Sequence, residues 1–110
     1  MPHKHKTHEE TISDIVSGND VVLFMKGTKE RPMCGFSGTV LRILNAFNLN
    51  IKDVNILSDV EFKESVKKYT DWPTFPQLYI NNKVVGGCDI IVDMYKSGEF
   101  ESLLKEEKLA

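Results

Sequence analysis

Apolar residues are grouped along the chain in short runs, and three of these runs predict β-strands. Residues 21–25, VVLFM, are continuously apolar and rich in β-branched side chains, which is typical of a strand buried on both faces. Residues 77–80 and 83–86 form two further runs, separated by Asn81 and Asn82. Because asparagine tolerates positive φ, this pair predicts a tight turn and hence an antiparallel hairpin.

Other segments carry apolar residues every three or four positions, as a helix with one buried face requires. The first helix is expected to start at Thr7, which has capping-box spacing to Glu10, and to end at Gly18. A second helix is expected to follow Cys34 and to run to about Asn48.

The middle of the chain predicts one more strand and one more helix. The strand is expected near residues 53–57. Ser58 and Glu61 have capping-box spacing and are expected to open the helix. Its inward-facing side chains are expected to be Phe62, Val66 and Tyr69.

The C-terminal part predicts a helix that begins at Asp89 and is interrupted at Gly98, followed by a short final helix around Leu103 and Leu104. The resulting order is α-β-α-β-α-β-β-α with an extra C-terminal helix. Strand–helix alternation that ends in a hairpin predicts an α/β fold, in which a four-stranded mixed sheet is flanked by helices.

A chain of 110 residues, 41% of them hydrophobic, has the size of one small domain. We expect a polar N-terminal tail at residues 1–6 and a single domain at residues 7–110. His3, His5 and His8 suggest a metal site. The surrounding sequence predicts no ordered arrangement for them, so a solvated tail is the preferred interpretation.

Charge and hydropathy narrow the functional classes. The 14 basic and 16 acidic residues give a net charge of −2, without the basic excess typical of nucleic-acid-binding proteins. No apolar run approaches the about 18 residues of a membrane span, so we expect neither nucleic acid nor a membrane as a partner. The two cysteines, Cys34 and Cys88, are too few for a disulfide scaffold, which favours a reducing compartment. The cytoplasm is the expected location, with the mitochondrial matrix or another organelle as the alternative if a transit peptide has been removed.

Cys34 is the strongest candidate for chemistry. It precedes a predicted helix, where unpaired backbone N–H groups carry partial positive charge and favour a thiolate. Lys26 lies upstream and is expected to add to this effect, and Gly35 leaves room for a ligand or another chain to approach the sulfur. An inert core cysteine is the alternative, which the flanking loop and glycine disfavour. A Cys-x-x-Cys redox motif would have its second cysteine at Ser37.

Four motifs carry a resemblance to a known family. They are FMKGT at 24–28, CGFS at 34–37, WPTFPQLY at 72–79 and VGGCD at 85–89. In this order and spacing they resemble the monothiol CGFS glutaredoxins, over roughly residues 9–108. The resemblance implies a thioredoxin fold, which agrees with the predicted order of elements.

The resemblance also implies a site. Cys34 is similar to the thiolate that attacks glutathionylated disulfides or binds iron, and Pro76 is similar to a cis-proline. Asp89 is similar to a residue that holds the γ-glutamyl end of glutathione, and it is also a candidate N-cap. Lys63 stands where the family usually has arginine, so an ordinary exposed position is an equal alternative to a carboxylate contact. Cys88 is expected in the glutathione site rather than at the iron, and its disulfide with Cys34 under oxidation stays open. The implied glutathione-binding residues are Lys26, Cys34, Gly35, Phe36, Lys63, Thr74, Phe75, Pro76, Gly87, Cys88 and Asp89.

The lone thiol leaves two functions open. Ser37 cannot expel a mixed disulfide from Cys34, so an external thiol, for which glutathione is the candidate, must do so. This predicts a glutathione-dependent thiol–disulfide oxidoreductase with weak turnover. Alternatively, a [2Fe–2S] cluster commonly needs four thiolates, which two chains and two bound glutathiones would supply. The resemblance favours this bridging cluster, which a homodimer would carry, while the apo form would be a monomer. It also implies transfer of the cluster to apo iron–sulfur proteins and pairing with BolA-like partners.

Overall fold

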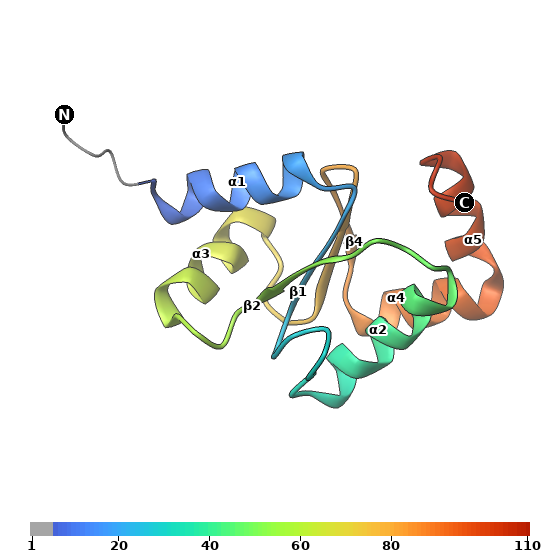
Figure 1. The fold of residues 1–110 in the computed structure, drawn as a ribbon, viewed down its shortest axis with the longest axis horizontal. Coiled ribbons are helices and arrows are strands. Elements are labelled where there is room, and N and C mark those ends of the chain that lie inside the picture. Colours follow the sequence, from blue (N-terminus) through green and yellow to red (C-terminus); the bar gives the residue numbers. More distant parts are fainter. Residues whose placement is uncertain (1–5) are drawn as a thin grey trace.

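Strand β1 (Val21–Met25) lies at the centre of the computed structural model, which describes residues 6–110 (Figure 1). It pairs in parallel with β2 (Lys52–Asn55) on one side and antiparallel with β3 (Gln77–Ile80) on the other. A tight turn joins β3 to the antiparallel edge strand β4 (Lys83–Gly86). The sheet therefore has the mixed order β2-β1-β3-β4, with β1 and β3 inside.

Helices cover both faces of this sheet, as Figure 1 shows. One helix pair, α1 and α3, packs on one face, and α2, α4 and α5 pack on the other. Their bounds are α1 His8–Gly18, α2 Gly35–Ala46, α3 Val60–Thr70, α4 Cys88–Ser97 and α5 Glu99–Glu106. None of the helices in this described part of the chain is long and apolar enough to cross a lipid bilayer.

The apolar run of β1 is continuous because the strand contributes to two cores. Val21, Leu23 and Met25 belong to the core under α2, α4 and α5. Val22 and Phe24 alternate with them and belong to the core under α1 and α3. All five side chains are buried, so the prediction of a strand buried on both faces is confirmed.

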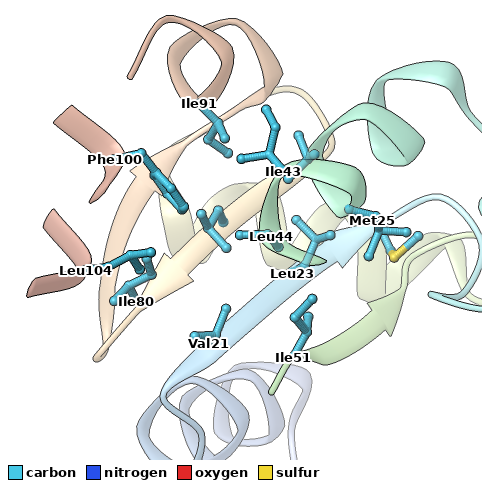
Figure 2. Packing of buried hydrophobic residues seen from close by; sticks show 13 residues of the cluster. Val21, Leu23, Met25, Ile43, Leu44, Ile51, Ile80, Ile91, Phe100 and Leu104 are labelled. Carbon is cyan, nitrogen blue, oxygen red and sulfur yellow. The ribbon is translucent and has the colours of Figure 1, made fainter. Parts of the chain in front are cut away.

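The larger core packs three helices onto the sheet, as Figure 2 shows. Leu44 of α2, Ile91 of α4 and Phe100 of α5 converge on the strand side chains, and each is fully buried. The ring of Phe100 also lies 5.5 Å from that of Phe47, just after α2. Burying one such side chain contributes about 1.5–3 kcal/mol, so the C-terminal helix is an integral part of the fold.

The order of elements agrees with the sequence prediction. Asn81 and Asn82 form the hairpin turn with positive φ values of 47° and 66°. Thr7 is the N-cap of α1 and shares reciprocal capping-box hydrogen bonds with Glu10. Gly98, with φ of 85°, separates α4 from α5. The predicted α/β arrangement is confirmed, including the extra C-terminal helix.

The second strand lies earlier than predicted. It was expected at residues 53–57 but ends at Asn55, because the side chain of that residue turns back on the main chain. Asn55 Oδ1 accepts hydrogen bonds from the N–H groups of Gly27 and Leu57, both at 3.0 Å. The end of β2 therefore holds the loop that follows β1.

Helix α3 differs from the prediction at its start and on its buried face. Its N-cap is Asp59 rather than Ser58, because the Asp59 carboxylate accepts hydrogen bonds from two first-turn N–H groups, at 2.9 and 3.2 Å. Tyr69 was expected to face inward but is 36% exposed, and Thr70 is buried instead. A smaller side chain fits at Thr70, where the helix meets the following loop.

The three histidines near the N-terminus are only partly described. His3 and His5 lie outside the described residues. His8 begins α1, and its Nε2 lies 3.6 Å from a carboxylate oxygen of Asp59, while its ring packs at a near right angle to that of Phe62. This histidine therefore belongs to the contact between α1 and α3.

A hydrogen-bonded contact joins the end of α5 to the β3–β4 turn. Asn81 Nδ2 donates to the backbone carbonyl of Glu107 (3.2 Å) and to its carboxylate (2.9 Å). Lys83 Nζ lies 3.5 Å from the same carboxylate. The hydrogen bond from Asn81, and the charge of Lys83 to a smaller extent, lower the pKa of Glu107.

We predict that Glu107→Gln destabilises the fold at neutral pH and that the difference disappears in acid. Because the pKa of Glu107 is lower in the folded than in the unfolded protein, its ionised form stabilises the fold above the ordinary glutamate pKa of about 4.3. This stabilisation is lost as the pH falls through the folded-state pKa. Urea unfolding of both proteins, from about pH 7 to about pH 3, measures it. Glu106→Gln, at an exposed neighbour, is the control, and an equal pH-dependent loss there would contradict the prediction.

Candidate functional site

The loop between β1 and α2 is closed by backbone hydrogen bonds. Lys26, the first residue after β1, donates its N–H to Ser37 Oγ (3.2 Å), and its carbonyl accepts from the N–H of Met33 (2.9 Å). Gly27 turns the chain with φ of 91°, and a Cβ there would lie only 2.4 Å from the Arg31 carbonyl oxygen. Lys26 is therefore held in a fixed backbone position next to the start of α2.

Cys34 is the N-cap of α2, where the sequence predicted a helix-start thiol. Its sulfur makes no regular capping hydrogen bond. The backbone N–H of Ser37 nevertheless lowers the pKa of the Cys34 thiol, and the N–H of Phe36 adds to this effect. The Lys26 ammonium and the Ser37 hydroxyl lower the pKa further, and partial burial opposes these effects. Cys34 is therefore biased toward the thiolate.

Cys88 has the opposite character. It is the first residue of α4, whose N-cap is Gly87. Burial raises the pKa of Cys88, as do the negative charges of Asp89 and of ionised Cys34. Both thiols are free. The prediction that Asp89 caps this helix is wrong, because the chain enters α4 earlier, but Asp89 lies in the first turn, where a carboxylate still stabilises the helix.

A cavity of about 570 Å³ lies next to these groups, between α3 and the first turn of α4. Every predicted glutathione-binding residue except Cys34 and Gly35 lines it. The lining thus comes from the end of β1, the first turn of α2, α3, the segment before β3, and the start of α4. The structure therefore brings together residues that are up to 63 positions apart, from Lys26 to Asp89.

Four residues of the lining were not predicted, namely Lys67, Trp72, Pro73 and Ile90. Lys67 lies one helical turn after Lys63, so the i, i+4 spacing of the two lysines was a signal that could have found it. Trp72, the first residue of the WPTFPQLY motif, is half-buried and also lines the cavity.

The charges around the cavity are separated by sign. Lys63 and Lys67 come from α3, Lys26 from the end of β1, and Asp89 from α4 on the other side of the sheet. The Lys67 ammonium also forms an ion pair with Glu64, 3.1 Å away on the same helix. The cavity therefore offers ammonium groups at the α3 side and a carboxylate, together with helix N–H groups, at the α4 side.

The segment before β3 packs tightly against the start of α4. A Cβ on Gly87 would lie 3.3 Å from the carbonyl oxygen of Pro76 and 3.4 Å from Trp72 Nε1, so glycine allows this close approach. The Phe75–Pro76 peptide bond is cis, as predicted. Gln77 is fully buried and donates to the carbonyl of Trp72 (2.8 Å). These contacts fix this wall of the cavity.

Apolar side chains surround the thiol on the outside. Met33 is 66% exposed and Phe36 is 61% exposed, on either side of Cys34 in the sequence. Ile90 in the first turn of α4 is 38% exposed. These side chains offer an apolar contact surface next to the sulfur.

Comparison with known proteins places these features in one family. The Glutaredoxin family model matches residues 21–85, more than half of the chain. "Probable monothiol glutaredoxin 2" of Rickettsia typhi is 56% identical over 96 residues, covering 87% of this chain and 86% of that protein. Plant relatives include proteins named as chloroplastic and as mitochondrial.

Solved structures agree with this relationship. The solution structure of reduced poplar apo GrxS14 has a TM-score of 0.80 at 47% identity, covering 91% of this chain and 92% of that one. A buckwheat glutaredoxin–glutathione complex shares the fold, with a TM-score of 0.78 at 19% identity, covering 93% of this chain and 91% of that one. The predicted thioredoxin fold is confirmed by these neighbours. With its single activated thiol at the start of α2, the chain belongs to the glutaredoxin family and, within it, to the monothiol glutaredoxins.

Proposed function

We propose that the cavity binds glutathione with its sulfur next to Cys34. The observation that carries this proposal is an activated thiol beside a cavity whose charges are separated by sign. Glutathione has a carboxylate at its glycine end and both an ammonium and a carboxylate at its γ-glutamyl end. The lysines of α3 complement the first end, and Asp89 with the free N–H groups of α4 complements the second. The buckwheat glutaredoxin solved with glutathione has the same fold, which supports this placement.

The main function that we infer is carriage of a [2Fe–2S] cluster. With glutathione bound, one chain offers two sulfurs, one from Cys34 and one from the tripeptide. Within residues 6–110 no three or more His, Cys, Asp or Glu side chains are grouped as metal ligands, so one chain alone lacks a ligand set. Two half-sites would complete the four thiolates that such a cluster commonly needs. Because glutathione is held without a covalent bond, the cluster is cargo that can leave.

Thiol–disulfide exchange is the second candidate function. The lowered pKa of Cys34 favours it, because the thiolate is the attacking species. Cys34 would attack the glutathione sulfur of a mixed disulfide and release the other thiolate. A second glutathione thiolate would then attack the Cys34–glutathione bond, releasing Cys34 and forming glutathione disulfide. The raised pKa of Cys88 makes it a poor internal substitute for this second thiol, so turnover depends on external glutathione.

Partners and location follow from the cluster function as proposals. The cluster-bound form would be a homodimer and the apo form a monomer, with the exposed side chains of Met33 and Phe36 available for contacts between chains. Apo iron–sulfur proteins would accept the cluster, and a BolA-like protein would be an alternative partner. The cytoplasm stays the predicted location, and relatives named for chloroplast and mitochondrion keep an organelle as the alternative.

We predict that the purified protein, incubated without oxygen with iron, sulfide and glutathione, forms a coloured dimer that requires glutathione. Visible absorption measures the cluster, and size-exclusion chromatography measures the dimer. Cys34→Ser is expected to abolish both, because it removes the only activated thiolate of the described chain. Cys88→Ser is the matched comparison at the second cysteine, and its cluster should still require glutathione. A stable cluster in Cys34→Ser, or one that forms without glutathione, would contradict the cluster proposal.

Lys63 provides a test of the glutathione site. Lys63→Gln is expected to weaken glutathione binding roughly twofold to fivefold, the range of a solvent-accessible ion pair. Lys63→Arg should bind at least as tightly as the natural protein, because a guanidinium matches a carboxylate in two places. The single tryptophan, Trp72, lines the cavity, so its fluorescence reports the titration.

The control for this titration is Lys68→Gln, at an exposed lysine that does not line the cavity. It removes the same charge from the same helix and should leave the affinity unchanged. Equal weakening by both substitutions would mean that only the overall charge matters and would contradict a contact from Lys63.

A further inference from the structure

Gln77, the first residue of β3, is a polar side chain in the interior of the protein. It has no exposed surface, and it pairs with Phe24 of β1 across the sheet. Because side chains alternate along a strand, Gln77 lies on the same face as Tyr79, which belongs to the core under α1 and α3. An amide in such a core is costly unless its polar atoms are hydrogen-bonded.

Only half of this amide is hydrogen-bonded. Its Nε2 donates to the carbonyl of Trp72 at 2.8 Å. Its Oε1 accepts no hydrogen bond from the part of the chain that the structure describes, residues 6–110. An apolar side chain of the same length, such as methionine, would avoid the burial of this oxygen. Folding stability alone therefore does not explain a glutamine at this position, and the hydrogen bond to Trp72 is the feature that sets it apart from an apolar residue.

Trp72 is held through its backbone from two directions. Its N–H donates to Thr70 Oγ1 (3.2 Å) and to the carbonyl of Lys67 (3.3 Å), both in the last turn of α3. Its carbonyl accepts the hydrogen bond from Gln77 at the start of β3. The side chains of Thr70 and Gln77 are both buried. Trp72 is thus fixed to the helix before it and to the strand after it.

This fixed residue belongs to the binding cavity, whereas Gln77 lies behind it. Residues 72–76 line the cavity. The indole of Trp72 also lies against the start of α4, where a Cβ on Gly87 would be 3.4 Å from its Nε1. A cavity wall that is already ordered binds its ligand more tightly, because less conformational entropy is lost on binding. Gln77 can therefore influence the ligand without touching it.

We propose that Gln77 is a positioning residue, whose buried amide holds the Trp72 carbonyl and so keeps the 72–76 segment in its binding conformation before glutathione arrives. The inference rests on the proposed function, because glutathione is the ligand for which the segment is ordered. It separates two parts of the site. The hydrogen bond from Gln77 prepares the cavity wall, while the start of α2 prepares the thiol.

Gln77→Met keeps the length of the side chain and removes the hydrogen-bond donor. The affinity for glutathione, measured by isothermal titration calorimetry, is expected to fall roughly threefold to tenfold, the effect of losing one hydrogen bond between neutral groups. The pH profile of Cys34 alkylation by iodoacetamide should stay in place, because the pKa of this thiol depends mainly on N–H groups of α2. Peptide mass spectrometry measures Cys34 separately from Cys88. An unchanged affinity, or a Cys34 profile that shifts together with the affinity, would overturn the proposal.

Tyr79→Phe is the matched control, because it removes a polar group two positions further along the same face of the same strand. It should leave the affinity unchanged, and an equal weakening in both variants would overturn the role of Gln77. Thermal unfolding followed by circular dichroism verifies that the variants are folded. Failure of the unsubstituted protein to bind glutathione would refute the proposed function, whereas equal binding by the unsubstituted protein and Gln77→Met would overturn only the present inference.

A second measurement needs no ligand. Trp72 is the single tryptophan, so its fluorescence anisotropy reports how firmly the segment is held. The anisotropy should fall in Gln77→Met. It should fall less in Thr70→Val, because the N–H of Trp72 keeps the carbonyl of Lys67 as an acceptor. An anisotropy equal to that of the unsubstituted protein in both variants would overturn the proposal.

Discussion

The site depends on one constraint, namely that the start of α2 is held against the end of β1 with its first N–H groups directed at Cys34. β1 is fixed because it is buried in both cores. Lys26 directly follows it, and hydrogen bonds to Ser37 and from Met33 hold its N–H and its carbonyl. The loop between β1 and α2 is also hydrogen-bonded to Asn55 at the end of β2. The thiol of Cys34 therefore keeps the environment that favours its ionised form.

The two-faced sheet also determines the shape and charge of the binding cavity. α3 and α4 pack on opposite faces of the sheet. Both helices, together with the segment that precedes β3, line the cavity. The lysines of α3 and the acidic first turn of α4 therefore face the same space from two sides. A ligand with charged groups at both ends and a sulfur between them suits this arrangement, which is why glutathione is the proposed occupant. The two cysteines at the starts of α2 and α4 have different environments, because backbone N–H groups lower the pKa of Cys34 while burial raises the pKa of Cys88.

The sequence alone determined the elements, because their signals are local. The continuous apolar run of β1 and the Asn81–Asn82 turn predicted their strands within a residue. Likewise, Thr7 and Glu10 predicted the start of α1, since a capping box involves only neighbouring residues. The thiol at a helix start was predicted in the same way, and the four motifs added most of the cavity lining through family resemblance.

Only the tertiary structure decided which of several local alternatives is used and which side chains meet. Asp59 and Ser58 both suit an N-cap, and Asp59 takes this position, where its second carboxylate oxygen also lies 3.6 Å from His8 of α1. Tyr69 and Thr70 both lie near the apolar face, and packing against the following loop buries the smaller one. The contact between Ser37 and the backbone of Lys26 crosses 11 positions of the chain. Local patterns carry no information about such pairs, because the free energy that selects them comes from burial in a shared core and from hydrogen bonds between distant segments.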